Sequence, residues 1–305
     1  MPEAVDREFL DPDVLGRLAA VPLFARSPMQ GNVSGRHQSP HRGSSVEFAE
    51  YRKYVPGDDT RRLDWRAYGR SDRFYIKEFE ADTNLRCCLV LDTSASMGFG
   101  PDSLRKIDYA RKLAAALAYL AVHQGDAVGL STVSKDLVQY LPPRRNPAHL
   151  RLIYNALGEA EPRGETGLVE VLHELAERIQ QRALVAVFSD LFVDPEALAD
   201  CFQHLRFRKH DAAIFHLLDR QEIDFHFDRP LRFVSLENDE VIIAEPSLIA
   251  DRYQEALQEY LEIIREGAIK SNVDYHPVVT DQSYEDVLAT FLAKRVPKQA
   301  RRSSP

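Results

Sequence analysis

The chain has 305 residues, of which 44% are hydrophobic and 28% charged, and these proportions exclude a disordered or fibrous protein. Its formal net charge of −8 argues against nucleic-acid binding by the whole chain. No stretch approaches the ~18 consecutive apolar residues needed to span a bilayer, and the first residues lack the basic-then-apolar order of a signal peptide. We therefore expect a cytoplasmic protein without a transmembrane segment.

The three cysteines point to the same compartment. Cys87 and Cys88 are adjacent in a predicted strand, so their side chains face opposite sides and should not pair with each other. Cys201 stands alone in a helical pattern. Because this odd count lacks the spacing of a metal site, we expect reduced, buried thiols in a reducing compartment.

Composition divides the chain into four segments. They are an N-terminal leader with one short helix (1–35), a basic and aromatic segment (36–82), a main domain (83–295) and a disordered tail (296–305). The second segment carries ten Lys or Arg against six Asp or Glu between Arg36 and Lys77, which makes it locally basic. Within it, residues 46–80 give no clear secondary-structure pattern.

Three interpretations of this basic and aromatic segment are open. Arginine and aromatic side chains anchor many protein interfaces, so the segment is a candidate interaction surface. The alternative that we favour is a structural wrap, in which Asp58, Asp59 and Asp64 pair with neighbouring arginines while the aromatic rings pack on the main domain. Nucleic-acid binding is the weakest interpretation, because the six acidic residues would repel phosphate.

From residue 85 onward, short apolar runs alternate with stretches of helical spacing. The runs predict strands at Leu85–Leu91, Ala127–Val133, Leu137–Leu141, Ala183–Phe188, Ala212–Leu218 and Tyr275–Val279. The helical spacing predicts helices within 104–122, 147–157, 168–179, 197–205, 248–266 and 284–294, and a hairpin is expected from 231–235 and 240–244. This alternation favours a doubly wound α/β domain, with a mostly parallel sheet and helices on both faces.

Five polar residues follow the ends of these predicted strands or begin the helix between them. They are Asp92, Ser94 and Ser96 in a D-x-S-x-S pattern, Thr166 in Gly164-Glu165-Thr166, and Asp190 after the strand at 183–188. Because ligands bind at the carboxyl ends of the strands in such sheets, we expect the five side chains to lie together. Carboxylate and hydroxyl oxygens are hard ligands, so the set predicts a Mg²⁺ site, with Mn²⁺ or Ca²⁺ as alternatives. Glu165 is an alternative ligand to Thr166.

The D-x-S-x-S pattern is weak evidence by itself. It occurs by chance in roughly one chain in ten of this length at average amino-acid usage, and Asp or Ser after a strand commonly caps the next helix. The position at a strand end, with Thr166 and Asp190 following in order, favours the metal site. A cation held in this way would keep one coordination position open for the carboxylate of a partner protein.

This order of motifs resembles the metal-ion-dependent adhesion site of von Willebrand factor A domains. The resemblance implies that the cation is held by Asp92, Ser94, Ser96, Thr166 and Asp190. Upstream, the strings YRKYVPGDD (51–59), RRLDW (61–65) and KEFE (77–80) resemble the bacterial domain-of-unknown-function 58 family, in which such a signature is joined to an A-type domain. The resemblance covers roughly residues 30–295.

The predicted ligands have no general base, nucleophile or substrate-orienting Arg or Lys cluster near them in the sequence, so we expect a protein-binding module rather than an enzyme. The resemblance implies a MoxR-type AAA+ ATPase as its partner. Many relatives carry membrane-spanning segments that are absent here, so it also implies a soluble short form. The alternative function is a metal-dependent hydrolase in which the same cation activates water. The sequence contains no P-loop and no G-x-S-x-G nucleophile elbow. His216 lies within an apolar run, and we expect a core residue rather than a metal ligand.

Overall fold

The computed structural model describes residues 12–18, 21–24, 47–53, 68–70, 74–80, 85–102, 104–227, 229–238 and 240–296. The chain divides into two compact units, of which the first comprises Met1–Phe24 with Arg86–Pro305 and the second comprises Ala25–Leu85. The expected disordered tail falls almost wholly outside the described residues.

Among the described residues, a sheet of six strands forms the centre of the first unit. Its strands are β3 (Arg86–Asp92), β4 (Ala127–Val133), β5 (Leu137–Arg144), β6 (Leu184–Ser189), β7 (Asp211–Leu218) and β10 (Asp274–Val279). They lie in the order β10-β7-β6-β3-β4-β5, and every neighbouring pair is parallel except β4 with β5. The predicted strands and the mostly parallel sheet are confirmed, with β5 as an antiparallel edge strand.

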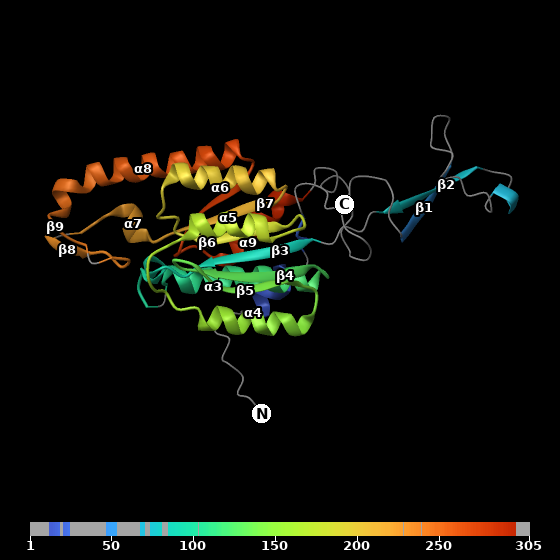
Figure 1. Ribbon diagram of the computed structural model, residues 1–305, viewed down its shortest axis with the longest axis horizontal. Coiled ribbons are helices and arrows are strands. Elements are labelled where there is room, and N and C mark those ends of the chain that lie inside the picture. The colour runs from blue at the N-terminus through green and yellow to red at the C-terminus, as the bar shows by residue number, and fades with distance from the viewer. Residues whose placement is uncertain are drawn as a thin grey trace, which may run out of the picture. The chain divides into compact units, whose positions relative to one another are not determined.

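Helices cover both faces of this sheet, as predicted (Figure 1). Their bounds are α3 (Lys106–His123), α4 (Pro147–Glu159), α5 (Leu168–Arg178), α6 (Pro195–Phe207), α8 (Pro246–Lys270) and α9 (Tyr284–Arg295). Helices α5, α6 and α8 pack side by side on one face, whereas α3 contacts α4 and α9 on the other. The first unit is therefore a three-layer α/β domain.

The core explains why the strands read as continuous apolar runs. Cys88 and Val90 of β3 pack in one cluster with Leu172 of α5 and with residues of α6 and α8. On the opposite face, Phe215 of β7 contacts Phe291 of α9, with ring centroids 5.2 Å apart. Because helices cover both faces, successive strand residues are all buried, and each large apolar side chain contributes about 1.5–3 kcal/mol.

The sequence pattern does not predict some short helices that lie near the carboxyl edge of the sheet. They are the 3-10 helix η2 (Ala95–Gly98) and the helix α7 (Arg220–Asp224), whose N-cap Asp219 forms a capping box with Glu222. The predicted hairpin is confirmed as β8 (Leu231–Val234) paired antiparallel with β9 (Val241–Ala244).

The short helix expected in the leader is α1 (Pro12–Leu18), and it packs on α3 and α9. Arg17 forms an ion pair with Glu285 at 2.6 Å. The Leu23 N–H donates to the side chain of Gln124 at 2.8 Å. The described part of the leader is therefore packed against the main domain.

The second unit contains an antiparallel pair of strands, β1 (Glu47–Lys53) and β2 (Tyr75–Glu80). No strand pattern marks these residues in the sequence, because charged and aromatic residues alternate there without an apolar face. The three Asp residues expected to pair with arginines, and the arginines themselves, lie outside the described residues. The structural wrap stays a prediction.

Two further expectations concern buried groups. Cys87, Cys88 and Cys201 are free and buried, as predicted. His216 is fully buried, with its Nδ1 2.8 Å from the Tyr275 hydroxyl, so its role in the core is confirmed. Among the described residues, no helix has both the length and the apolar character that a membrane crossing requires.

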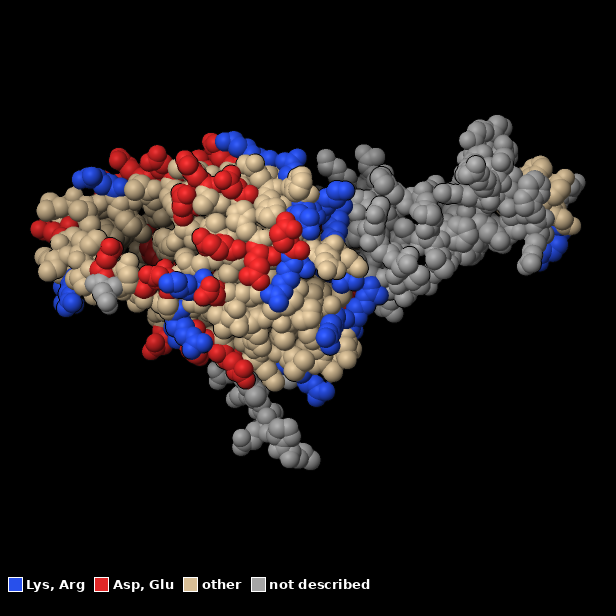
Figure 2. All heavy atoms as spheres, viewed as in Figure 1, with Lys and Arg blue, Asp and Glu red and all other residues tan. Residues whose placement is uncertain are grey.

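The acidic character of the chain is visible on its surface. Figure 2 shows Asp and Glu side chains gathered over the face that carries α5, α6 and α8. Such a face repels phosphate groups, so it does not favour nucleic-acid binding.

Candidate metal centre

The candidate site lies where the strand order of the sheet reverses. The first strand of the sheet in chain order, β3, has β4 on one side and β6 on the other. The crevice at the carboxyl ends of two such strands is the usual ligand site of a doubly wound sheet. Asp92 is the last residue of β3, and Ser189 is the last residue of β6. The topology therefore brings the two polar strand ends to one edge.

The Asp92 carboxylate is the centre of the cluster, and it is almost fully buried. Its Oδ1 accepts a hydrogen bond from the Ser94 N–H at 2.8 Å. Its Oδ2 accepts from the Ser189 hydroxyl at 2.6 Å and from the Thr166 hydroxyl at 3.4 Å. Burial, followed by the nearby charge of Asp190, raises the pKa of Asp92 to about 6. A positive charge at this position would favour the ionised carboxylate.

The two serines of the D-x-S-x-S pattern present their hydroxyls together. The Oγ atoms of Ser94 and Ser96 are 3.1 Å apart. The turn that carries them is held by the loop before α5: the Ala95 N–H donates to the Gly164 carbonyl, and the Arg163 N–H donates to the Thr93 carbonyl. The backbone thus fixes the spacing between this turn and the threonine loop.

Close backbone packing fixes the threonine loop. A Cβ atom on Gly167 would lie 1.9 Å from the Lys135 carbonyl oxygen, so only glycine fits there. The Ser134 hydroxyl donates to the Arg163 carbonyl at 2.6 Å. Thr166 therefore points to Asp92, whereas the exposed Glu165 lies beside Lys135, with 3.8 Å between the charged atoms. This geometry favours Thr166 over Glu165 as the ligand at the loop.

Asp190 is held differently from the other four predicted ligands. Its Oδ2 lies 2.6 Å from the Lys106 ammonium, which is fully buried and also contacts Glu222 at 2.7 Å. Burial favours a neutral amine, but the charges of Asp190 and Glu222 outweigh it and raise the pKa of Lys106 above its ordinary value. The ammonium stays charged. It neutralises part of the acidic charge at this edge and orients Asp190.

The cluster fits a hard divalent cation. Asp92, Ser94, Ser96 and Thr166 form a connected set of carboxylate and hydroxyl oxygens, the ligands that Mg²⁺ accepts. The Ser189 hydroxyl also donates a hydrogen bond to the Asp92 carboxylate. Among the described residues, no group of three or more His, Cys, Asp or Glu is arranged to hold a metal ion. A cation here would therefore rely on hydroxyls for several of its ligands.

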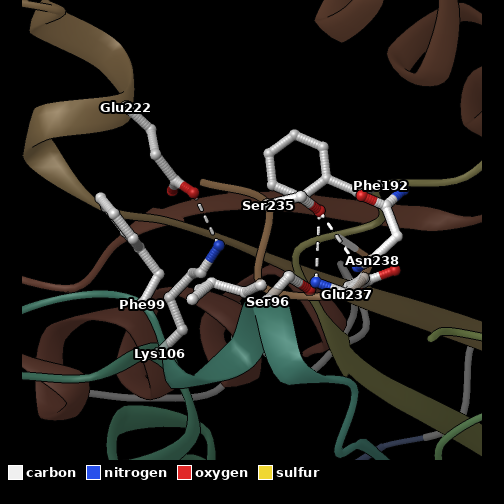
Figure 3. A pocket seen from close by; sticks show the side chains of 9 residues that line it. Ser96, Phe99, Lys106, Phe192, Glu222, Ser235, Glu237 and Asn238 are labelled. Carbon is white, nitrogen blue, oxygen red and sulfur yellow. Dashed lines mark hydrogen bonds and ion pairs between the residues drawn. The ribbon is translucent and has the colours of Figure 1, made fainter. Parts of the chain in front are cut away.

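A pocket of about 270 Å³ opens beside these residues (Figure 3). It is lined by Ser96, Phe99, Lys106, Phe192, Glu222, Ser235, Leu236, Glu237 and Asn238. One wall comes from the turn between β8 and β9, where Glu237 Oε2 accepts a hydrogen bond from the Thr166 N–H at 3.3 Å. The hairpin is therefore part of the site.

Sequence reasoning missed four of the polar residues at this edge. They are Lys106, Ser189, Glu222 and Glu237. Ser189 precedes a predicted ligand and ends a strand, which is a signal that could have found it. Lys106 lies in the first turn of the helix after the serine turn, and a lysine there opposes the helix dipole. Glu222 stands three residues after Asp219, the spacing of a capping box, and this signal could have placed it at a helix start. Glu237 contacts Thr166 over a long range, with no local sequence signal.

Topology and site together define a class of protein. In chain order, the six strands lie third, second, first, fourth, fifth and sixth across the sheet, with an antiparallel edge and a cluster of acids and hydroxyls after the first strand. This is a von Willebrand factor A-like fold. The chain belongs to the family described as Protein of unknown function DUF58, which matches residues 50–260.

Two curated relatives match the chain at equal similarity. Uncharacterized protein Mb1516 of Mycobacterium bovis and Uncharacterized protein Rv1480 of Mycobacterium tuberculosis are each 30% identical to it over 187 residues. The matched region is 61% of this chain and 59% of each relative. The chain thus spans less than two thirds of the length of these relatives.

Three solved structures resemble the chain at low sequence identity. BatB from Bacteroides thetaiotaomicron is 12% identical with a TM-score of 0.48, covering 70% of this chain and 98% of that chain. An aerotolerance-related membrane protein from Bacteroides fragilis is 16% identical with a TM-score of 0.44, and the match covers 69% of this chain and 100% of that chain. The SpRpn10 VWA domain is 13% identical with a TM-score of 0.41, and the match covers 68% of this chain and 95% of that chain. These similarities concern the fold and carry no statement on function.

Proposed function

We propose that the chain is a metal-dependent protein-binding module. The proposed ligands of its cation are Asp92, Ser94, Ser96, Thr166 and Asp190. The observation that carries this proposal is the buried Asp92 carboxylate at the switch point of the sheet, which accepts hydrogen bonds from the hydroxyls of Ser189 and Thr166 and from the Ser94 N–H. A bound Mg²⁺, or Mn²⁺ or Ca²⁺ in its place, would supply an open coordination position for a carboxylate of the partner.

The chain's own residues prepare this site for a charged ligand. Asp92 is held in place by Ser94 and Ser189, so little reorganisation is needed when a cation arrives. The Lys106 ammonium lies 2.6 Å from Asp190 Oδ2 and orients this side chain at the same edge. Rigid ligands of this kind lower the entropic cost of binding.

The rim of the pocket supports a protein as the partner. Phe192 and Leu236 line the pocket and are 44% and 52% exposed. Exposed large apolar side chains around a polar centre are typical of protein interfaces. A partner would therefore place an acidic side chain at the centre and apolar side chains around it. We propose that the module acts by this binding and has no enzymatic activity of its own.

The proposed partner is a MoxR-type AAA+ ATPase, which would use the chain as an adaptor or co-chaperone in the cytoplasm. The support for the ATPase is the resemblance of the 51–80 signature to the family. The support for the cytoplasm is the set of three free, buried cysteines.

The experiment is a capture assay with the full-length chain and a purified MoxR-type ATPase from the same organism. The wild-type chain should capture the ATPase in Mg²⁺ and lose it in EDTA, and Asp92→Asn should lose it in both. Asp136→Asn is the matched control, because Asp136 is an exposed acid in the β4–β5 turn and undergoes the same charge change. It should behave as the wild type does.

Two results would overturn parts of the proposal separately. Equal capture by the wild type and Asp92→Asn would remove the metal site from the function. If the ATPase is not captured although Mg²⁺ stabilises the wild type and not Asp92→Asn, the metal site stands and the partner is wrong.

A further inference from the structure

The turn between β8 and β9 places a carboxylate of the chain itself beside the candidate metal centre. Glu237 lies at this turn and lines the same pocket as Ser96 (Figure 3). Its Oε2 accepts a hydrogen bond from the Thr166 N–H at 3.3 Å, while the Thr166 hydroxyl donates to Asp92 at 3.4 Å. Thr166 therefore contacts both carboxylates: its N–H donates to Glu237 and its hydroxyl donates to Asp92.

The second oxygen of Glu237 has no hydrogen-bond donor among the described residues. This atom, Oε1, is buried even though the residue as a whole is partly exposed. A buried carboxylate oxygen without a donor is unfavourable, and native structures retain such atoms mainly where another partner satisfies them. A divalent cation beside Asp92 is a chemically suitable partner.

The turn that carries Glu237 is ordered by its own contacts. The Ser235 hydroxyl accepts hydrogen bonds from the N–H groups of Glu237 and Asn238 at 3.3 and 3.2 Å. At the base of the hairpin, Phe233 stacks with Phe225 at 5.7 Å between ring centroids. These contacts hold the backbone at Glu237, and the hydrogen bond from the Thr166 N–H holds its carboxylate at the site.

We propose that Glu237 is an intramolecular ligand of the metal centre, occupying the coordination position that a partner's carboxylate takes. The β8–β9 hairpin is then a lid on the site, and a partner binds by displacing Glu237. This inference rests on the proposed metal-dependent function and adds a mechanism of regulation to it. It also explains why the exposed rim residue Leu236 is adjacent to the acid in sequence: the same turn would meet the arriving partner.

The test uses Mn²⁺ as the probe, because its bound water molecules can be counted by magnetic resonance. The full-length wild type, Glu237→Gln, Asp92→Asn and the matched control Glu240→Gln are compared. Glu240 lies in the same hairpin and is exposed. Glu237→Gln should gain one exchangeable water on Mn²⁺ and bind it about tenfold more weakly, a typical loss when a supporting group of a metal site is removed. Glu240→Gln should match the wild type.

Hydrogen exchange gives an independent readout of the lid. Mn²⁺ should slow amide exchange at the β8–β9 turn of the wild type but not of Glu237→Gln. If Glu237→Gln matches the wild type in water count, affinity and exchange while Asp92→Asn loses Mn²⁺, the intramolecular ligand is wrong and the metal site stands. If Asp92→Asn binds Mn²⁺ as the wild type does, both the metal site and this inference are overturned.

Discussion

The Lys106 ammonium and the Asp190 carboxylate form an ion pair of 2.6 Å in which both side chains are almost completely excluded from water. Lys106 also reaches Glu222 at 2.7 Å, so one cation compensates two acids. Breaking a buried pair from one side leaves uncompensated charge, whereas the intact pair contributes little net stability. Lys106 therefore supplies the positive charge that balances both acids at this edge of the sheet.

Lys106→Met should lower the free energy of unfolding in EDTA by ~3–5 kcal/mol, because it leaves the buried Asp190 and the half-buried Glu222 without a counter-charge. Urea denaturation measures this. The control is Lys135→Met, whose exposed ion pair with Glu165 is worth less than about 1 kcal/mol. Added Mg²⁺ should recover part of the loss in Lys106→Met, since the cation then compensates Asp190. A loss equal to that of Lys135→Met would mean that the buried pair is not stabilising the fold.

Asp92→Asn should have opposite effects in EDTA and in Mg²⁺. The folded-state pKa of Asp92 is raised to about 6 by burial and by Asp190, above its ordinary value of 3.8. Its contribution to stability is therefore full below about pH 4 and is lost as the pH rises through about 6. At pH 8 in EDTA, Asp92→Asn should be the more stable protein by about 1–3 kcal/mol, at about 1.4 kcal/mol per pKa unit.

In Mg²⁺ the order should reverse, because only the wild type gains binding energy from the cation. Thermal unfolding at pH 8, with and without Mg²⁺, measures both effects on the same samples. Mg²⁺ that stabilises both proteins equally would place the cation elsewhere.

His216 should make the protein sensitive to acid. Burial lowers its pKa from 6.5 to about 4, so the unfolded chain takes up a proton that the folded chain excludes between these values. Stability should fall by up to about 3 kcal/mol as the pH drops through this range, at about 1.4 kcal/mol per pKa unit. His216→Gln, which keeps a polar group near Tyr275, should show a flatter dependence. Asp92 titrates in both proteins, so the difference between their slopes reports on His216, and parallel slopes would assign the acid sensitivity to other groups.

Much of the fold was predictable from the sequence because the strands of the sheet are buried on both faces. β4 is predicted with its observed bounds, Ala127–Val133: it contains Ser131 and Thr132, but every residue of the strand is buried. The N-terminus of α3 was placed two residues early: Leu104 fits the helical spacing, but the Lys106 N–H donates to the Phe99 carbonyl and the helix starts there. Boundaries of this kind depend on tertiary contacts.

The site was predictable best where its residues follow strand ends, as Asp92 does at the end of β3. Thr166 lies in the loop that joins α4 to α5, and its contact with Asp92 depends on how this loop packs at the carboxyl edge of the sheet. Glu237 lies 71 positions from Thr166 in the chain, and no local pattern links the two. Lys106 was missed because a lysine at the start of a helix has no spacing signal that marks it as buried. Whether the five predicted ligands bind a metal stays a prediction.

Gly167→Ala tests whether the backbone packing of the threonine loop supports the site. The added Cβ would meet the Lys135 carbonyl at 1.9 Å, so the loop must move and Thr166 must shift relative to Asp92. The expected cost is about 1–3 kcal/mol of stability, as for other overpacked positions, together with weaker Mg²⁺ binding. Isothermal titration with Mg²⁺ and urea denaturation measure the two effects.

The control is Gly158→Ala, at a helical position of α4 where a new Cβ meets nothing within 4 Å. It should raise stability by about 0.5–1 kcal/mol, because alanine is the better helix former, and leave Mg²⁺ binding unchanged. If Gly167→Ala loses stability but keeps the wild-type Mg²⁺ affinity, Thr166 is not a ligand. The cation would then be held by the D-x-S-x-S turn and Asp190 without the threonine loop.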